Sequence, residues 1–246
     1  MHININQLLE KLRASGSLEP DASKENKPLA GVDCPICNNQ GRTVFLKDGM
    51  IFSKECECMA ARRSIIRARK SGLSDLLNEC TFDSFKTPNR ETSYLKSKGM
   101  EYAARKDGKW FFVHGTPGTG KTHVCTAICN QLIKSGNNVK YVIWNEIAQK
   151  LKSVINDPEY EAMMNELKAA EVLYIDDFLK GTPSDADIKR AFEIINARYN
   201  MRNKKTIIST ERDLRYINSL DPAVAGRINQ RAKGYCLKIE GINWRM

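Results

Sequence analysis

A run of eight residues near the middle of the chain combines glycine, lysine and threonine in an order that can hold phosphate groups. The run is Gly115-Thr116-Pro117-Gly118-Thr119-Gly120-Lys121-Thr122. Glycines permit the backbone conformations that turn successive amide N–H groups toward phosphate oxygens, with the positive end of a following helix behind them. We expect Lys121 to reach the β- and γ-phosphates of a nucleotide and the Thr122 hydroxyl to coordinate Mg²⁺. A chance glycine-rich turn is the alternative, which the strand pattern before the loop and the helix pattern after it disfavour.

Two adjacent acids further along the chain complete the chemistry that a bound nucleotide needs. Asp176 and Asp177 follow the apolar run Val172–Ile175 directly. We expect Asp176 to hold Mg²⁺ through its water shell and Asp177 to orient or deprotonate the attacking water. Taken alone, the two acids would indicate a solvated turn; together with the loop upstream, they favour a nucleotide site. No Asn-Lys-x-Asp guanine-binding pattern follows Lys121, so ATP is favoured over GTP.

Four cysteines near the N-terminus have the spacing of a metal site. Cys34 and Cys37 form one pair, and Cys56 and Cys58 form a second pair. The intervening residues Gly41–Phe52 predict a β-hairpin, which would bring both pairs to one Zn²⁺ in a closed, structural four-thiolate site. In a chain without an export signal, disulfides are the least expected use of cysteine.

Composition and charge favour a globular protein of the cytoplasm. The chain has 246 residues, of which 41% are hydrophobic, and 39 Lys and Arg against 29 Asp and Glu give a formal net charge of +10. No stretch approaches the roughly 18 unbroken apolar residues of a membrane-spanning helix, and residues 1–18 lack the charged start and apolar middle of a signal peptide. Membrane and secreted proteins are therefore largely excluded. The positive charge suggests attraction to a polyanion such as nucleic acid.

Short apolar runs alternate with helical patterns from about Lys109 onward, which predicts a three-layer α/β domain with a parallel sheet. The predicted strands are Trp110–Val113, Val139–Ile143, Val172–Ile175, Thr206–Ile208 and Tyr235–Ile239. The predicted helices are Lys121–Lys134, Glu146–Ile155, Glu159–Ala169, Asp185–Tyr199 with Ser184 as N-cap, and two short ones near Asp213–Ser219 and Pro222–Ala232. We expect two domains, a zinc-binding module with a basic linker helix over residues 1–70 and a nucleotide-binding domain over residues 71–246.

The residues before this domain offer little continuous apolar core. Ile3–Leu12 carries apolar residues on one face of a possible short helix, which would dock on a partner or on its own domain. The run Arg62–Lys70 has five basic side chains and predicts either a helix that contacts DNA phosphates or a solvated linker helix, two interpretations with equal support. The five are Arg62, Arg63, Arg67, Arg69 and Lys70.

Taken in order, these motifs resemble a known family. The cysteine pairs, the basic linker, Ser71-Gly72-Leu73, Thr81-Phe82-Asp83-Ser84-Phe85, the phosphate loop and the two acids resemble the DnaC/DnaI-type replicative helicase loaders, with the zinc module nearer to DnaI. The resemblance covers most of the chain, is strongest from Thr81 to Met246, and extends to the IstB-like ATPases that assist transposition. It implies an AAA+ ATPase fold with strand order 5-1-4-3-2 and no C-terminal lid domain.

Three further motifs carry over by position from this resemblance. Ser209-Thr210-Glu211 lies where the family has a sensor of the γ-phosphate, but Glu211 replaces an amide, so sensing falls to Ser209 or Thr210. Gly226–Arg231 resembles the segment that presents an arginine finger, and Arg227 would reach the ATP of a neighbouring subunit. Asn243-Trp244-Arg245 resembles the second sensor, in which Arg245 would contact the γ-phosphate in cis. Without the resemblance, each arginine indicates a surface salt bridge.

The resemblance also implies partners. These are a hexameric replicative DNA helicase of the DnaB/DnaC type, single-stranded DNA, and further copies of the chain in a ring or helicase-bound assembly. The DNA path would run past Tyr141, Trp144 and the loop Leu179–Thr182, which contains Lys180. Tyr141 also fits the protein core, because it lies within a predicted buried strand.

We therefore expect an ATPase that loads the replicative ring helicase onto single-stranded DNA during replication initiation, with slow hydrolysis that a partner or DNA stimulates. An alternative within the same class is a transposition helper that delivers a transposase to target DNA. An alternative of another class is a non-hydrolysing zinc adaptor that binds helicase or DNA. Such a protein would use ATP only as a structural ligand. ATP turnover that DNA or helicase stimulates would separate the enzyme from the adaptor.

Overall fold

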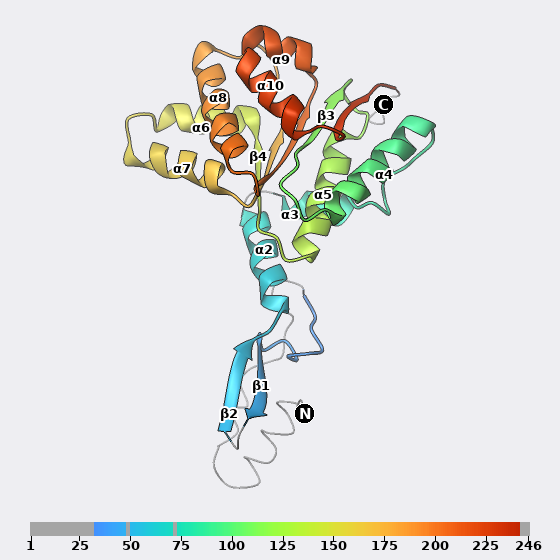
Figure 1. Cartoon of the computed structure of the whole chain (residues 1–246), viewed down its shortest axis with the longest axis vertical. Coiled ribbons are helices and arrows are strands. Elements are labelled where there is room, and N and C mark those ends of the chain that lie inside the picture. The colour runs from blue at the N-terminus through green and yellow to red at the C-terminus, as the bar shows by residue number, and fades with distance from the viewer. Residues whose placement is uncertain (1–31, 48–49, 71–72, 242–246) are drawn as a thin grey trace. The chain divides into compact units, whose positions relative to one another are not determined.

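The computed structural model describes residues 32–47, 50–70 and 73–241, and the chain divides into two compact units, residues 1–66 and 67–246 (Figure 1). The expected helix over Ile3–Leu12 and the expected second sensor, Asn243-Trp244-Arg245, lie outside the described residues. Within the described residues, no helix is both long enough and apolar enough to cross a membrane. The division after Ile66 falls inside helix α2 (Cys58–Lys70), which also contains the expected boundary at residue 70.

The smaller unit is built on an antiparallel hairpin, as the sequence predicts. Strands β1 (Arg42–Lys47) and β2 (Met50–Glu55) pair with Phe45 opposite Phe52, and these two rings stack with centroids 5.8 Å apart. β2 continues past the predicted hairpin end at Phe52 to Glu55, so the hairpin leads directly into the second pair of cysteines.

The larger unit carries a five-stranded parallel sheet. Its strands are β3 (Phe111–Gly115), β4 (Val139–Ile143), β5 (Val172–Asp176), β6 (Lys205–Thr210) and β7 (Cys236–Ile239). They lie in the order β7-β3-β6-β5-β4, and every neighbouring pair is parallel. Counted along the chain, this is the order 5-1-4-3-2 that the family resemblance implies. All five predicted strands are confirmed: β4 has the predicted bounds, and the ends of the other four differ by at most two residues.

Helices cover both faces of this sheet, which gives the predicted three layers (Figure 1). One face is covered by α4 (Arg90–Ala104) and α5 (Lys121–Lys134), with α3 (Ser74–Glu79) against α5. The other is covered by α6 (Trp144–Ser153), α7 (Pro158–Ala169), α8 (Asp185–Asn200), α9 (Leu214–Leu220) and α10 (Pro222–Arg231). Because strand side chains alternate between faces, Leu173 and Ile175 of β5 join the core under α6, α7 and α8.

The helices differ from the predicted ones mainly at their ends and in two additions. Ser184 caps α8 as predicted, because its hydroxyl accepts the Asp187 N–H and the Asp187 carboxylate accepts the Ser184 N–H. Helices α3 and α4 were not predicted. The sequence of α4 is largely polar, and its clearest local signal is the capping box that Asn89 forms with Thr92.

Candidate nucleotide-binding site and metal centre

The phosphate loop lies between the end of β3 and the start of α5, as the sequence predicts. Gly115 has φ +143°, and a Cβ atom there would lie 1.8 Å from the Ile239 carbonyl oxygen, so only glycine fits beside β7. Gly118 and Gly120 also have positive φ angles, +77° and +92°. The amide groups of the loop therefore lead into the amino end of α5, where the helix dipole favours anions.

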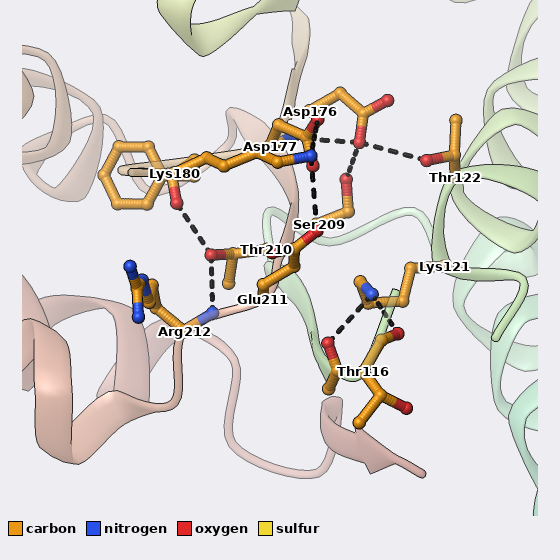
Figure 2. Close-up of polar contacts among 12 residues, drawn as sticks. Thr116, Lys121, Thr122, Asp176, Asp177, Lys180, Ser209, Thr210, Glu211 and Arg212 are labelled. Atoms are coloured by element: carbon orange, nitrogen blue, oxygen red, sulfur yellow. Dashed lines mark hydrogen bonds and ion pairs between the residues drawn. The ribbon is translucent and has the colours of Figure 1, made fainter. Parts of the chain in front are cut away.

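Lys121 is held inside the loop. Its ammonium donates hydrogen bonds to the carbonyl oxygens of Gly115 and Thr116, at 2.9 and 2.6 Å (Figure 2). Burial lowers the pKa of Lys121, and the nearby carboxylate of Glu211 opposes this change most strongly. Phosphate oxygens are stronger acceptors than carbonyl oxygens for an ammonium group, so the arrangement suits an exchange of partners when a polyphosphate binds.

Asp176 ends β5 as a buried carboxylate enclosed by hydroxyl groups. Thr122 Oγ1 donates to Asp176 Oδ1 at 3.3 Å, and the Ser209 hydroxyl donates to the same oxygen (Figure 2). On the other side, the Tyr141 hydroxyl donates to Asp176 Oδ2 at 3.3 Å. Burial raises the pKa of Tyr141, and the Asp176 charge adds to this, so the phenol stays protonated as a donor. The predicted Mg²⁺ pair, Thr122 and Asp176, is thus brought together across the sheet.

Asp177 and the residues after it form a strained loop at the edge of the site. Asp177 and Leu179 have left-handed φ angles of +52° and +53°, which are uncommon for residues other than glycine. The Lys180 ammonium bridges Asp177 Oδ2 at 3.0 Å and Glu211 Oε1 at 3.2 Å. Its hydrogen bond to Asp177 is the main cause that raises the pKa of Lys180. Lys180 was expected on the DNA path, but its ammonium is instead engaged within the nucleotide site.

The expected sensor residues lie beneath the site rather than in it. Ser209 is 1% exposed, and its hydroxyl contacts Asp176 and, at 3.1 Å, the Tyr174 hydroxyl. Thr210 is fully buried and donates to the Phe178 carbonyl oxygen at 2.7 Å (Figure 2). Both hydroxyls are therefore used to fix Asp176 and the loop after it. The role of these two hydroxyls as γ-phosphate sensors stays a prediction, and Glu211 is the residue of this motif that lines the pocket.

These groups open into a pocket of ≈ 490 Å³. Beside the phosphate loop and the carboxylates, its wall contains residues that the sequence analysis did not select: Leu76, Cys80, Ser84, Phe85, Lys86 and His123. The His123 Nε2–H donates to the Thr81 carbonyl oxygen at 3.0 Å, and the ring packs edge-on against Phe85 with centroids 5.1 Å apart. This partly apolar wall beside a phosphate loop fits a nucleotide base. The segment Thr81–Phe85 had been noticed only for its family resemblance.

Two other predicted site residues lie away from the pocket. The Arg227 guanidinium lies over the rings of Phe192 and Tyr199, at 5.3 and 5.6 Å, and donates to the Ala223 carbonyl oxygen. Trp144 is 2% exposed and packs edge-on against Phe178 in the core, with centroids 5.0 Å apart. Tyr141 is 5% exposed. The expected DNA path past the Trp144 ring is therefore wrong, because this ring is buried, and Tyr141 takes the core position that the sequence also allowed.

The four cysteines of the smaller unit come together as predicted. The Sγ atoms of Cys34, Cys37, Cys56 and Cys58 all lie within 4.8 Å of one another. The sulfurs of Cys34 and Cys56 are 3.8 Å apart, and those of Cys37 and Cys58 are 3.6 Å apart. Tetrahedral Zn²⁺ with Zn–S bonds of about 2.3 Å holds its sulfurs about 3.8 Å apart. The four sulfurs are thus compatible with a closed zinc site. A hydrogen bond from the backbone N–H of Cys37 lowers the pKa of the Cys34 thiol to about 7.

Two basic residues of α2 support this metal centre instead of facing solvent freely. Arg62 is 1% exposed, and its guanidinium donates to the carbonyl oxygens of Asn39 and Val32 and to the Asn39 side chain. Arg63 pairs with Glu55 through two hydrogen bonds of 2.8 and 2.7 Å. The predicted helix over Arg62–Lys70 is confirmed as part of α2, but Arg62 is buried and Arg63 is paired, so neither is a free cation for DNA phosphates.

Removal of zinc is expected to unfold the smaller unit and to leave the larger unit folded. The buried cluster of the smaller unit's described residues consists of the cysteines themselves, so little apolar core would remain. We expect about one zinc per chain by elemental analysis, and rapid proteolysis confined to residues 32–66 in a Cys58→Ser variant or after chelation. Cys80→Ser is the matched control, since Cys80 belongs to the larger unit. Equal protease resistance of both variants would show that metal does not hold the unit.

Comparison with known proteins places the larger unit in a family. Residues 76–233 match the family model of the bacterial DnaA ATPase domain. The phage-like element PBSX protein XkdC of Bacillus subtilis (strain 168) is 27% identical over 263 residues, which cover 98% of this chain and 95% of XkdC. The replicative helicase loader DnaC of Escherichia coli (strain K12) is 28% identical over 151 residues, which cover 60% of each chain. The predicted resemblance to helicase loaders is thereby confirmed.

A solved structure agrees with these matches at the level of the fold. It is the replication initiator DnaA bound to AMPPCP and single-stranded DNA, with a TM-score of 0.57 and 23% identity. The match covers 67% of this chain and 50% of that DnaA chain, so the initiator has a large part without a counterpart in the match. The AAA+ fold predicted from the motifs is confirmed.

Proposed function

The chain belongs to the family of the bacterial DnaA ATPase domain, and from this premise we propose that it is an ATP-dependent loader of a replicative ring helicase onto single-stranded DNA. The observation that carries the proposal is the nucleotide site, in which Lys121, Thr122 and Asp176 converge below a pocket of nucleotide size. The match to E. coli DnaC supports the loading role. The ligands of the DnaA structure, AMPPCP and single-stranded DNA, support ATP and DNA as ligands here.

In this proposal, each part of the site has one task. The amide groups of Gly115–Thr122 and the Lys121 ammonium bind the β- and γ-phosphates. Thr122 and Asp176 hold Mg²⁺, which would neutralise charge on the phosphates when bound. Asp177 orients the attacking water and accepts its proton as the water oxygen bonds to the γ-phosphorus and ADP leaves. Ser209 and Tyr141 are positioning residues, because they fix the carboxylate of Asp176.

We assign the sensing of the γ-phosphate to Lys180 and Glu211. The Lys180 ammonium joins Asp177 to Glu211 at the pocket edge, so it neutralises the carboxylate that would act on water. A γ-phosphate competes with these carboxylates for the ammonium and would thereby release Asp177. This coupling gives a reason for slow hydrolysis in the isolated protein.

Two arginines complete the proposed catalytic machinery in an assembly. Arg227 would leave the rings of Phe192 and Tyr199 and stabilise transition-state charge on the ATP of a neighbouring subunit. Arg245 would contact the γ-phosphate in its own subunit. Both roles rest on the position of these residues in the family motifs, and the first requires a ring or a helicase-bound complex.

A non-hydrolysing adaptor is the second candidate, favoured by the ion pair that occupies Asp177. Such a protein would bind ATP to stabilise a helicase-binding or DNA-binding surface. A transposition helper of the same fold is a third candidate, and the zinc module argues for the loader instead. Phosphate release that rises on addition of helicase or single-stranded DNA would exclude the adaptor.

The proposal is tested by mixing the full chain with the replicative helicase of its host, without nucleotide, with ADP and with ATP. Size-exclusion chromatography with mass detection should show a stable complex whose amount depends on ATP. The Lys121→Ala variant should lose this dependence, because the loop can no longer hold the β- and γ-phosphates. Absence of a complex in every nucleotide state, with zinc bound, would overturn the loader and favour a transposase or another DNA-bound partner.

A further inference from the structure

A second polar cavity, of ≈ 510 Å³, lies at the opposite edge of the sheet from the nucleotide pocket. Its wall includes Lys109 before β3, Arg202 before β6 and Arg231 before β7. Parallel strands place their amino ends at one edge and their carboxyl ends at the other, and the phosphate loop follows the carboxyl end of β3. The two cavities therefore face away from each other across the length of the sheet.

Two basic side chains of this cavity, Lys109 and Arg231, donate hydrogen bonds to uncharged carbonyl groups. The Arg231 guanidinium donates to the carbonyl oxygens of Gly108 at 2.6 Å and Arg202 at 2.9 Å, and it lies over the Trp110 ring. Lys109 Nζ donates to the Lys233 carbonyl oxygen at 3.2 Å. Carbonyl groups fix the direction of these side chains but leave their charge in place. Burial, and next the Arg202 charge, lower the pKa of Arg231, which shows that like charges crowd here.

The turns around this cavity hold several basic residues whose charge no ion pair among the described residues neutralises. The basic residues of these turns that have no ion pair with any carboxylate in the described part of the chain are Lys106, Lys109, Arg202, Lys204, Arg231 and Lys233. The acid in the same turns, Asp107, is engaged by Arg105. These unpaired positive charges attract a polyanion, and without one their mutual repulsion lowers the stability of the folded unit.

The chemistry of the wall indicates which polyanion fits. The Tyr199 hydroxyl donates to Gln230 at 2.7 Å, and the Arg227 guanidinium lies over its ring, so this ring is not open for base stacking. A surface of cations without free aromatic faces contacts phosphates and not bases. We propose that this amino-edge groove, defined by Lys109, Arg202 and Arg231 of the cavity wall and by Lys233 of the adjoining turn, binds the phosphodiester backbone of nucleic acid. The inference rests on the proposed action of the chain on DNA and replaces the rejected path past Trp144.

The test compares two variants of the full chain with the same change in net charge. The groove variant carries Arg202→Glu and Lys233→Glu, and the control carries Arg215→Glu and Lys189→Glu on α9 and α8. All four side chains are exposed, and none forms an ion pair within the part of the chain that the structure describes, so both variants should have the Tm of the wild-type protein. Binding of a fluorescein-labelled 25-nucleotide poly-dT strand, and of a 25-base-pair duplex, is measured by anisotropy at several salt concentrations.

We expect the groove variant to bind at least about tenfold more weakly than wild type, with a salt dependence reduced by about two phosphate contacts. The control should weaken by less than about threefold, and both variants should bind ATP as wild type does. If the groove variant loses binding to the single strand, to the duplex or to both, that result identifies the nucleic acid whose backbone the groove binds. Equal weakening of the two variants, or none, would overturn the groove. Because helicase is absent from this assay, its result is separate from the test of loading.

Discussion

Substitution of Asp177 by asparagine is expected to lower the turnover of ATP by about 100- to 10,000-fold, the usual contribution of a positioned general base. Asparagine keeps the shape of the side chain and tolerates the left-handed φ of +52°, so the loop should be retained. The amide cannot accept the proton of the attacking water. Turnover is measured by phosphate release in the presence of helicase and single-stranded DNA, where stimulation makes the loss measurable.

The dissociation constant of ATP should change by less than about threefold in the same variant, because the phosphate loop and Asp176 are untouched. Asp185→Asn, which removes an exposed carboxylate at the start of α8, is the matched control and should hydrolyse ATP as wild type does. Turnover by Asp177→Asn within threefold of wild type would remove Asp177 from the reaction. If wild type itself shows no stimulated turnover, the adaptor becomes the better description.

Substitution of Arg198 by methionine is expected to destabilise the larger unit by about 3–5 kcal/mol, because several buried oxygen acceptors would lose their donor at about 1–3 kcal/mol for each one left unsatisfied. Arg198 is fully buried and donates to the carbonyl oxygens of Leu167, Lys168 and Ala170 at the end of α7. It also contacts the start of β6 through Thr206. Methionine fills much of the volume but leaves these buried acceptors without donors.

Thermal unfolding should show this as a fall in Tm of about 6–20 °C, given about 2–4 °C per kcal/mol for a unit of this size. The Tm of Arg198→Lys should lie between those of the wild-type protein and Arg198→Met, because one ammonium group cannot reach all the acceptors that the guanidinium group contacts. Arg202→Met is the control, since its exposed side chain forms no hydrogen bond within the described residues, and it should stay within about 0.5 kcal/mol. A Tm for Arg198→Met equal to that of the control would show that the buried network contributes nothing.

The sequence predicted the parts of the site that depend on a short run of residues. Gly115–Thr122 specifies its own loop, because glycine positions, the lysine and the following helix are all local. The two acids after β5 and the cysteine pairs on either side of a hairpin are local in the same sense. Alternation of apolar runs and helical patterns predicted all five strands and the helices that follow β3 in the chain, but not α3 or α4, because side-chain periodicity follows from backbone geometry.

Other features depend on contacts between residues far apart in the chain. The family resemblance placed Trp144 on a DNA path, but its ring packs against Phe178 in the core, and the Tyr141 hydroxyl donates to Asp176. Arg62 and Arg63 are adjacent and chemically alike, yet the first is buried against Asn39 and the second pairs with Glu55 at the surface. No local pattern distinguishes such residues.

The sequence by itself therefore determined the fold class, the phosphate loop, the cluster of four cysteines and the position of the two acids at the end of β5. Only the tertiary structure decided that Ser209 and Thr210 support the site from below, that Glu211 and Lys180 face the pocket, and that basic turns gather at the far edge of the sheet. The reason is physical. Local backbone periodicity is encoded in neighbouring residues, whereas burial, ion pairing and convergence of charge arise only when distant segments pack together.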